Sequence, residues 1–379
     1  MRRSALVIIL TDNPGGAERV ACAVSNALAR RGWQVELDVV CREDRGFVRS
    51  ATSSEVQVNS GYWARERVAF PTYPRRLVGR RFDLVFTTHV HTNALLSVLR
   101  ASGLVSMGSL VSRESTTIFD RFRGLKRLIF RAMYRLYGSQ DLLIAQTGYM
   151  KEHIAPYVRA GLRSRTHVLP NPVDLEAIGA GADQPLPSNI EAALAGRENI
   201  LFCGRLIEVK QPILALQAFT RAVANRPMDE RPRLVFMGDG PLGPAVEAAA
   251  RTAGLADDDV VFLGRQSNPY SIMRRCQYGI LTSSREGFPN VLLEMMATGV
   301  RKIVATPCAG DLDLLTGVTV TPDFKLDSVA EALERAIANG EDRGEDYRRI
   351  IASRSIDAFV DDMLSKVGVS GPQPVPMVK

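Results

Sequence analysis

Short apolar runs alternate along the chain with longer stretches in which apolar residues recur at helical spacing. The run ALVIIL at residues 5–10 is expected to form a buried strand, and residues 16–32 carry apolar side chains at helical spacing before a closing glycine. The same alternation predicts strands at residues 33–41 and 82–89, in SLVS and in DLLIAQT. Because helices connect neighbouring parallel strands, this rhythm predicts a parallel sheet with helices on both faces.

Two prolines interrupt the rhythm in VLPNPVD, residues 168–174, and the pattern then starts again. We interpret this segment as an interdomain hinge, although an ordinary surface loop would have the same composition. Further strands are expected in NILFCGRL, RLVFMGDGP, VVFLG, YGILTS, RKIVAT and VTVTP. The pattern predicts an α/β protein with Rossmann-like domains at residues 1–170 and 171–345, a helix at 346–366 that returns toward the first domain, and a flexible tail at 367–379. Two such sheets with their loops on one cleft would bind a ligand at the carboxyl ends of their strands.

Composition excludes several other classes of protein. The chain has 379 residues, of which 46% are hydrophobic, enough for two globular cores. Its five cysteines form no CxxC or His/Cys cluster, which argues against structural zinc and for a reduced, cytoplasmic setting. The apolar run near the start is better explained as a strand than as a signal peptide, and no segment reaches the roughly 20 apolar residues of a membrane span.

The net charge of +7 is unevenly distributed. Residues 1–176 hold 26 Lys and Arg against 15 Asp and Glu, a net charge of +11, and the remainder holds 22 against 26, a net charge of −4. The first half is therefore expected to meet an anionic partner, such as a nucleic acid, a phospholipid surface or a phosphorylated substrate.

The segment SSREGFPNVLLEMMATGV, residues 283–300, places two carboxylates around a turn that opens a helix. Pro289 suits the first helical position, where no N–H donor is needed. The N–H groups expected to face an anion or a hydroxyl belong to Asn290, Val291 and Leu292. With Glu286 before the turn and Glu294 one turn into the helix, the pattern suits a sugar nucleotide, which has two polyol ends and a diphosphate between them. Spacing alone fits equally well a helix N-terminus whose acidic residues complement the helix dipole.

Two further segments follow expected strands. In CGRLIEVKQP, Arg205 and Lys210 could clamp a diphosphate, although in isolation they are better explained as solvated surface cations. In DNPGGAER, Gly15 and Gly16 would let the backbone approach a ligand closely. Neither GxGxxG nor GK[ST] is present there, which disfavours a dehydrogenase or a P-loop enzyme.

Together these motifs resemble those of the retaining glycosyltransferases of family four, which have two facing Rossmann-like domains, the GT-B fold. The resemblance covers nearly the whole chain, because GGAERVACAVSNALARRGWQVELDVV, VLPNPVD, GRLIEVK, MGDGP, VVFLG and EGFPNVLLEMMATG occur in the family's order. It implies a GT-B α/β fold and transfer of a sugar from a nucleotide sugar with retention of configuration. UDP is the implied carrier, with GDP as the second choice.

The resemblance also implies roles for individual residues. Glu286 matches the glutamate that contacts the transferred sugar, and Glu294 the one that binds the ribose hydroxyls. Arg205 and Lys210 match the pair that holds the diphosphate and stabilises its departure. The other implied donor-binding residues are Gly15, Gly16, Arg265, Gly287, Phe288, Pro289, Asn290 and Val291.

No metal or other cofactor is expected, because two cations and a helix N-terminus meet the charge of the diphosphate. The acidic runs at residues 257–259 and 311–313 are interpreted as surface loops rather than metal sites. Retention without a placed carboxylate nucleophile implies a front-face displacement in which the leaving phosphate takes the proton of the acceptor. The protein would then act by positioning and electrostatic stabilisation.

One position departs from the commonest family pattern. Many relatives have a histidine where this chain has Arg113 and Glu114 in LVSREST. The variant resembles a subgroup that acts on lipid-linked or polysaccharide acceptors. It leaves open whether His89 or His91 takes over a polar role, and we favour a structural or acceptor-binding role over a catalytic one.

The segment RFRGLKRLIFRAMYRLYG, residues 121–138, is expected to form a basic amphipathic helix of the kind that lies on anionic membranes. Its basic stripe is Arg123, Arg127, Arg131 and Arg135, and its apolar stripe is Phe122, Leu125, Ile129, Met133 and Leu136. PRRLVGRR at 74–81 adds four arginines. An ordinary helix packed on its sheet is the alternative, and no motif supports nucleic-acid binding.

With the resemblance, these observations predict a peripheral enzyme at the inner face of the plasma membrane that glycosylates a lipid-linked or polysaccharide-precursor acceptor. Two alternatives stay open: a GT-B nucleotide-sugar epimerase, and a glycosyltransferase with a soluble small-molecule acceptor.

Overall fold

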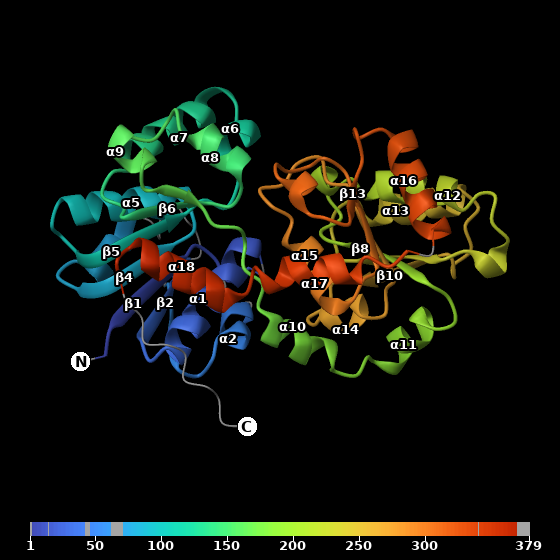
Figure 1. Ribbon diagram of the computed structural model, residues 1–379, viewed down its shortest axis with the longest axis horizontal. Coiled ribbons are helices and arrows are strands. Elements are labelled where there is room, and N and C mark those ends of the chain that lie inside the picture. Colours follow the sequence, from blue (N-terminus) through green and yellow to red (C-terminus); the bar gives the residue numbers. More distant parts are fainter. Residues whose placement is uncertain (1, 14, 42–45, 62–70, 340, 370–379) are drawn as a thin grey trace. The chain divides into compact units, whose positions relative to one another are not determined.

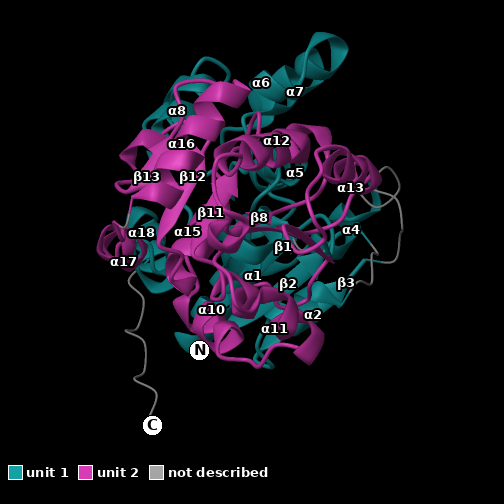
Figure 2. Cartoon of the chain, turned by 90° about the vertical axis from the view of Figure 1, so that its right-hand side faces the viewer, with its two compact units in different colours: residues 1–172, 354–379 teal, residues 173–353 magenta. Residues whose placement is uncertain are grey.

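The computed structural model describes residues 2–13, 15–41, 46–61, 71–339 and 341–369. The chain divides into two compact units, which are Met1–Pro172 with Arg354–Lys379 (unit 1) and Val173–Ser353 (unit 2) (Figure 1, Figure 2). Each unit contains one parallel sheet with helices packed on it, which confirms the expected pair of Rossmann-like domains. The boundary after Pro172 lies within the VLPNPVD segment.

Unit 1 has a seven-stranded parallel sheet in the order β3-β2-β1-β4-β5-β6-β7. Its strands are β1 (Ser4–Ile9), β2 (Gln34–Val39), β3 (Val56–Ser60), β4 (Arg81–Thr87), β5 (Ser106–Arg113), β6 (Leu142–Ala145) and β7 (Thr166–Val168). Its helices are α1 (Gly16–Arg30), α2 (Phe47–Ala51), α4 (Pro74–Leu77), α5 (Val90–Ala101), α6 (Ile118–Arg121), α7 (Gly124–Leu136), α8 (Gly148–Ile154), α9 (Ala160–Arg163) and α18 (Ile356–Lys366). The chain builds outward from β1 to β3 and then continues on the other side of β1, so the winding direction reverses between β1 and β4.

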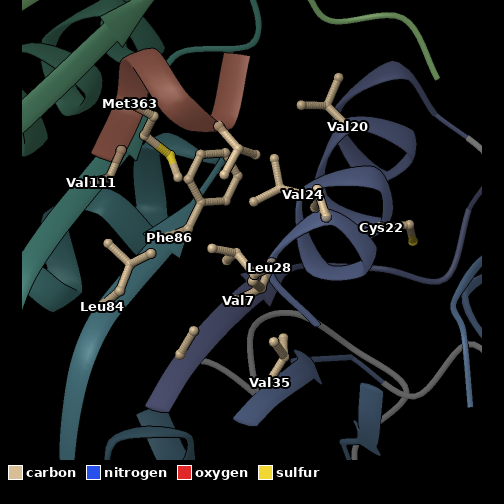
Figure 3. Close-up of a cluster of buried hydrophobic side chains, with 14 of the residues drawn as sticks. Val7, Val20, Cys22, Val24, Leu28, Val35, Leu84, Phe86, Val111 and Met363 are labelled. Atoms are coloured by element: carbon tan, nitrogen blue, oxygen red, sulfur yellow. The ribbon is translucent and has the colours of Figure 1, made fainter. Parts of the chain in front are cut away.

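The core of unit 1 joins the two ends of the chain. Val24 and Leu28 on α1 pack in one buried cluster with Val7 of β1 and Phe86 of β4. Met363 of α18 reaches the same cluster (Figure 3). Alternating strand residues and one face of α1 thus bury their apolar side chains together, as their spacing predicts.

A buried arginine fastens α18 to α1. Arg31 caps the C-terminus of α1, and its side chain is fully buried. Its guanidinium donates to the carboxylates of Asp357 at 2.6 Å and Asp361 at 2.9 Å, both on α18, and to the carbonyl of Ala27 at 3.0 Å. A buried charge is tolerated when it is paired and hydrogen-bonded in this way.

The prediction of a single helix at residues 346–366 is wrong. Two helices occupy this region: α17 (Gly344–Ala352) belongs to unit 2 and α18 to unit 1. The break occurs because Ser355 starts a new helix, its hydroxyl accepting the N–H of Ala358 at 3.2 Å. Most of the tail expected at 367–379 lies outside the described residues, which end at 369.

Unit 2 has a six-stranded parallel sheet in the order β10-β9-β8-β11-β12-β13. Its strands are β8 (Asn199–Cys203), β9 (Arg233–Met237), β10 (Val260–Gly264), β11 (Tyr278–Leu281), β12 (Lys302–Ala305) and β13 (Val318–Val320). Its helices are α10 (Leu175–Ala182), α11 (Ser188–Leu194), α12 (Pro212–Ala222), α13 (Gly243–Thr252), α14 (Tyr270–Met273), α15 (Asn290–Thr298), α16 (Leu326–Ala338) and α17, with short 3-10 helices η1 (Glu208–Lys210), η2 (Met228–Glu230) and η3 (Leu312–Leu314). Here the winding reverses between β8 and β11. Ligands of open α/β sheets bind at the carboxyl ends of the strands at such a reversal.

Candidate functional site

The reversal in unit 2 brings Lys210 and Glu286 together. Lys210 ends η1 after β8, and Glu286 lies in the loop after β11. Nζ of Lys210 donates to Oε1 of Glu286, and the two side chains are 20% and 18% exposed. Ser283 Oγ donates to the same carboxylate oxygen at 2.8 Å. A cation and a carboxylate are therefore held in one orientation where open α/β sheets bind their ligands.

Backbone hydrogen bonds hold the Glu286 loop against its neighbours. The N–H of Glu286 donates to the carbonyl of Cys308 at 2.7 Å, and that of Ser284 to the carbonyl of Val209 at 2.8 Å. Burial, assisted by the nearby Glu286 carboxylate, raises the pKa of the Cys308 thiol to about 12. The thiol is therefore uncharged at neutral pH and does not compete with Glu286 for Lys210.

The residue after Lys210 has an unfavourable backbone conformation. Gln211 has a φ of 47°, in the left-handed region that costs a residue with a side chain about 1 kcal/mol or more. The buried hydroxyl of Thr282 lies 3.0 Å from the carbonyl oxygen of Lys210 and 2.9 Å from that of Gln211. Thr282 thus fixes the peptide that positions Lys210, and conformations of this kind cluster at functional sites.

The helix after the Glu286 loop starts one residue later than predicted. Pro289 is the N-cap, with an extended ψ of 93°, and α15 begins at Asn290. The N–H of Leu292 donates to the carbonyl of Pro289 at 3.1 Å, so it is not available to a ligand as we had expected. Phe288 is buried in the core of unit 2 and anchors the turn, and Glu294 is half-buried on α15.

Two arginines follow strands at the same edge of the sheet. Arg205 comes shortly after β8 and Arg265 directly after β10, and both are exposed. Between them, a Cβ on Gly238 would lie 2.0 Å from the carbonyl oxygen of Gly204, so the turns after β8 and β9 contact each other backbone to backbone. This contact keeps Arg205 at the sheet edge that also carries Lys210.

The reversal in unit 1 brings Glu18 and His89 together. Glu18 lies in the first turn of α1 after β1, and His89 is the N-cap of α5 after β4. His89 Nε2 is 3.5 Å from Glu18 Oε1. A Cβ on Gly15 would lie 2.4 Å from Glu18 Oε2, so the space beside this glycine holds the Glu18 carboxylate instead of a ligand. Gly16, the first residue of α1, is exposed.

Glu114 is the centre of a buried polar cluster. Its carboxylate accepts hydrogen bonds from the hydroxyls of Tyr134 at 2.7 Å and Tyr137 at 2.9 Å, and from the amide of Asn93 at 3.1 Å. Burial raises the pKa of Glu114, although these donors oppose the shift. Since Tyr134 belongs to α7, the cluster ties this helix to the end of β5.

Arg113 is also buried, and it holds the segment that precedes the unit boundary. It donates through Nη2 to Oδ1 of Asn171, whose amide donates to Gln146 at 3.1 Å. Burial lowers the pKa of Arg113 to about 10. Nε and Nη1 of Arg113 have no hydrogen-bond partner among the described residues. Arg113 and Glu114 are each only 1% exposed, so both side chains lie below the surface of unit 1.

The basic amphipathic segment contains a shorter helix than predicted. α7 begins at Gly124, Arg123 is its N-cap, and Phe122 lies outside it and stacks on Phe130 at 4.9 Å. α7 buries Phe130 and Tyr134 and leaves an apolar row in contact with solvent. The exposed fractions in this row are 74% for Leu125, 58% for Leu128, 46% for Ile129 and 48% for Leu136. Of the predicted apolar stripe, Leu125, Ile129 and Leu136 are therefore exposed, whereas Phe122 and Met133 pack against the buried cluster of unit 1 that contains Leu143 of β6.

Two of the four predicted stripe arginines have aromatic neighbours. Arg127 donates to the hydroxyl of Tyr157 at 3.1 Å, and the guanidinium of Arg131 lies 5.6 Å from the centre of the same ring. His91 meets Phe130 edge to face, with the ring centres 5.5 Å apart. No helix in the described part of the chain has both the length and the apolar character needed to cross a membrane.

The acidic run at 257–259 is engaged by arginines. Asp258 accepts from Arg233 at 2.6 Å and from Arg197 at 3.0 Å, and Asp259 accepts from Arg197 at 2.8 Å. The Arg233 hydrogen bond is the largest contribution that lowers the pKa of Asp258. Across the described ranges, no group of three or more His, Cys, Asp or Glu side chains is arranged to hold a metal ion.

The structure gathers some of the predicted residues and separates others. Lys210 and Glu286 form a pair in unit 2, with Arg205 at the same sheet edge, whereas His89 lies in unit 1 and pairs with a residue that we did not predict, Glu18. Glu18 follows GGA in GGAER, where an acidic residue in the first turn of a helix is ordinary, so only its contact with His89 distinguishes it. Ser283 and Thr282 were also missed.

Solved structures with similar folds include the Anabaena protein Alr3699/HepE in complex with UDP. That protein is 15% identical to this chain, with a TM-score of 0.74 over 97% of this chain and 99% of that one. At this identity the similarity establishes the two-domain GT-B fold.

Curated relatives are similar to parts or to most of the chain. The Bacillus subtilis protein named glycosyltransferase EpsF is 31% identical over 203 residues, which are 52% of this chain and 51% of that protein. The chain thus matches about half the length of this relative. An alpha-1,4-N-acetyl-D-galactosaminyltransferase of Campylobacter jejuni, whose name specifies a PP-undecaprenol-linked glycan, is 25% identical over 95% of this chain and 94% of its own length.

Two family descriptions match successive parts of the chain. Residues 14–177 match Glycosyltransferase Family 4, and residues 197–339 match Glycosyl transferases group 1. The first match lies mainly in unit 1 and the second entirely in unit 2. The chain is therefore a glycosyltransferase with the GT-B fold.

Proposed function

We propose that this protein is a retaining, metal-independent glycosyltransferase that uses a UDP-sugar and glycosylates a lipid-linked or polysaccharide-precursor acceptor at a membrane surface. The observation that carries this proposal is the Lys210–Glu286 pair at the winding reversal of unit 2. The UDP bound in the structure of HepE supports the choice of UDP over GDP. The PP-undecaprenol glycan in the name of the Campylobacter relative supports the class of acceptor.

In the proposed donor site, the diphosphate binds Lys210 and Arg205. A diphosphate brings anionic oxygens that compete with Glu286 for Lys210, so donor binding releases the Glu286 carboxylate to accept sugar hydroxyls. Glu294 on α15 binds the ribose hydroxyls, and the N-terminus of α15 faces the phosphates. These cations and the helix terminus then neutralise the leaving group without a metal ion.

The proposed chemistry needs no protein nucleophile. The acceptor hydroxyl forms the new bond to the anomeric carbon on the face from which the diphosphate departs, so configuration is retained. The hydroxyl proton passes to the departing phosphate oxygen. Lys210 and Arg205 stabilise the charge that develops on the diphosphate, which is the contribution expected of preorganised cations.

A thermal-shift series with UDP, GDP, ADP and dTDP tests the donor site. A nucleotide that binds only the folded state adds about 2.7 kcal/mol at a hundredfold excess over Kd. We expect UDP to give the largest shift, and Lys210→Ala and Arg205→Ala to abolish it. Arg251→Ala on the exposed face of α13 is the matched control and should keep the shift. A UDP shift that survives both site substitutions contradicts the proposed donor site.

The exposed apolar row on α7 supports the membrane part of the proposal. Leu125, Leu128, Ile129 and Leu136 leave large apolar surfaces on a helix that also carries Arg127, Arg131 and Arg135. Apolar side chains flanked by arginines are typical of helices that lie in the headgroup region of an anionic membrane. Binding here would place the enzyme at the inner face of the plasma membrane.

Flotation with liposomes tests this surface. We expect the protein to bind vesicles that contain anionic lipid at low salt and to be released as salt rises. Leu125→Ser combined with Leu128→Ser should weaken binding about tenfold or more, because burial of each leucine contributes about 1.5–3 kcal/mol. Leu104→Ser, at another exposed leucine of unit 1, is the control. Equal binding by the double variant and the wild type contradicts the membrane surface.

A further inference from the structure

Ser283 and Lys210 bind the same oxygen of Glu286, but they differ in their access to solvent. Ser283 Oγ donates to Glu286 Oε1 at 2.8 Å, and Nζ of Lys210 donates to that oxygen as well. The side chain of Lys210 is 20% exposed, whereas Ser283 is fully buried. Lys210 can therefore turn to another anion or to water, and the hydroxyl of Ser283 cannot reach solvent.

The hydroxyl of Ser283 depends on Glu286. Among the described residues, the carboxylate of Glu286 is the only hydrogen-bond partner of this hydroxyl. A buried hydroxyl without a partner costs free energy. Withdrawal of Glu286 into solvent would leave Ser283 in that state, whereas withdrawal of Lys210 would leave only a partly exposed ammonium group that water can solvate. Ser283 therefore opposes a movement of Glu286 away from its loop.

Ser283 is itself fixed by the segment that follows β12. Thr306 comes directly after β12 and is buried, and its Oγ1 donates to the carbonyl of Ser283 at 2.6 Å. The N–H of Glu286 donates to the carbonyl of Cys308 at 2.7 Å. Ser283 and Glu286 are thus both attached to residues 306–308, and neither of these two attachments involves Lys210.

One oxygen of the Glu286 carboxylate is left for a ligand. Ser283 and Lys210 both use Oε1, and Oε2 accepts no hydrogen bond from a residue that the structure describes. The side chain of Glu286 is 18% exposed, so a ligand can reach it. A carboxylate oxygen accepts hydrogen bonds from hydroxyl and N–H groups. In the proposed donor site, the group assigned to Glu286 is the transferred sugar, which carries such hydroxyls.

We infer that Ser283 is a positioning residue that keeps Glu286 oriented toward the sugar while Lys210 moves from the carboxylate to the diphosphate. Before the donor binds, Lys210 and Ser283 share Oε1. When the diphosphate binds, Lys210 leaves and Ser283 retains Oε1, so Oε2 accepts a hydroxyl of the sugar from a fixed direction. The inference rests on the proposed glycosyltransferase function, and it assigns Ser283 to recognition of the sugar rather than of the diphosphate.

The test compares the Kd for UDP with the Kd for UDP-glucose, UDP-galactose, UDP-N-acetylglucosamine and UDP-N-acetylgalactosamine, measured by titration calorimetry. Ser283→Ala removes the hydroxyl, Glu286→Ala removes the carboxylate, and a third variant carries both substitutions. Ser25→Ala is the matched control, because Ser25 is also fully buried and its hydroxyl donates to the carbonyl of Ala21 in α1 at 2.9 Å. The unfolding temperature of each variant is measured without ligand.

For the UDP-sugar that the wild type binds most tightly, we expect Ser283→Ala to raise Kd roughly tenfold, the value of one hydrogen bond to a charged group. The Kd for UDP should keep its wild-type value in Ser283→Ala, because Lys210 and Arg205 bind the diphosphate. Glu286→Ala should raise the Kd for the UDP-sugar at least as much, and adding Ser283→Ala to it should change nothing further. Ser25→Ala should alter neither Kd.

Three results overturn the inference and leave the proposed function standing. The first is wild-type affinity of Ser283→Ala for every UDP-sugar. The second is an equal loss of affinity for UDP and UDP-sugar together with a lower unfolding temperature, which would mean that Ser283 only maintains the loop. The third is a further loss when Ser283→Ala is added to Glu286→Ala, because Ser283 would then act independently of Glu286. If the wild type binds neither UDP nor any UDP-sugar, the proposed function fails and the inference fails with it.

Discussion

At the scale of single residues, the ionisation of the buried Glu114 carboxyl group is coupled to the stability of the fold. Its pKa is raised by burial, so the folded state favours the protonated form relative to the unfolded chain. The associated stability is fully present below the unfolded pKa, near the ordinary value of 4.5, and is lost as pH rises through the folded pKa. Two tyrosines and an asparagine donate hydrogen bonds to the Glu114 carboxylate and stabilise its ionised form. They therefore reduce the loss of stability at high pH but do not abolish it.

We therefore predict that Glu114→Gln, which cannot ionise, removes this pH dependence. The unfolding free energy of the wild type, measured with urea between pH 5 and pH 8, should fall relative to that of the variant by at most about 1.4 kcal/mol per pH unit, the limit for one proton. Glu152→Gln on the exposed side of α8 is the control and should run parallel to the wild type. Parallel curves for Glu114→Gln and wild type would show that Glu114 stays ionised throughout this range.

The second prediction at this scale concerns Thr282, whose hydroxyl holds the peptide between Lys210 and Gln211. Thr282→Val keeps the shape of the side chain and leaves buried carbonyl oxygens without this donor. We expect a loss of about 1 kcal/mol in unfolding free energy and a smaller UDP thermal shift, because Lys210 loses its fixed position. Thr220→Val, which removes a similar hydroxyl from α12, should leave the UDP shift unchanged.

At the scale of elements, most strands could be predicted because their apolar runs are continuous. The strand at residues 260–264 has the predicted bounds, and those at 5–10 and 278–283 differ by one or two residues. β3 was missed because its sequence, VQVNS, is short and half polar, and β7 was missed because it has only three residues and ends where the expected hinge begins. The break between α17 and α18 was missed because the helical spacing continues across a serine cap.

The candidate site was less predictable than the strands. Local patterns singled out Lys210 and Glu286 separately, but only the resemblance placed them in one proposed donor site, because they lie 76 residues apart and no local pattern joins them. The burial of Arg113 and Glu114 could not be predicted, because charged residues at a strand end are usually exposed. Glu18 was missed because it resembles an ordinary first-turn acidic residue until its contact with His89 is known.

The attachment of α18 to α1 allows a prediction about two adjacent arginines, Arg30 and Arg31, which both contact Asp357 of α18. Arg31→Met removes a fully buried guanidinium that donates to two aspartates and a carbonyl, and we expect it to lower the unfolding free energy by about 2–3 kcal/mol. Arg30→Met removes an arginine that is 30% exposed and lies 3.4 Å from one of the same aspartates, and it should cost no more than about 1 kcal/mol. Urea unfolding of both variants measures the difference. Equal losses would mean that burial of Arg31 gives it no advantage.

At the scale of the whole molecule, the two units are built differently from one chain. Unit 2 is continuous, whereas unit 1 is completed by residues from both ends of the sequence. α18 contributes apolar side chains to the core of unit 1, namely Ile356, Phe359, Val360, Met363 and Leu364. Unit 1 therefore depends on a segment that is synthesised after all of unit 2.

Truncation after Ser353 is predicted to separate the stabilities of the two units. It removes five buried apolar side chains from unit 1, at about 2 kcal/mol each, which is about as large as the whole stability of a typical domain. Calorimetry should therefore lose the transition of unit 1 and retain that of unit 2, whose continuous core keeps all of its residues. A chain that ends at Val369 keeps α18 and should retain both transitions. If the shorter chain loses both transitions together, the two units unfold as one cooperative structure. Their separate hydrophobic cores would then not give them independent stabilities.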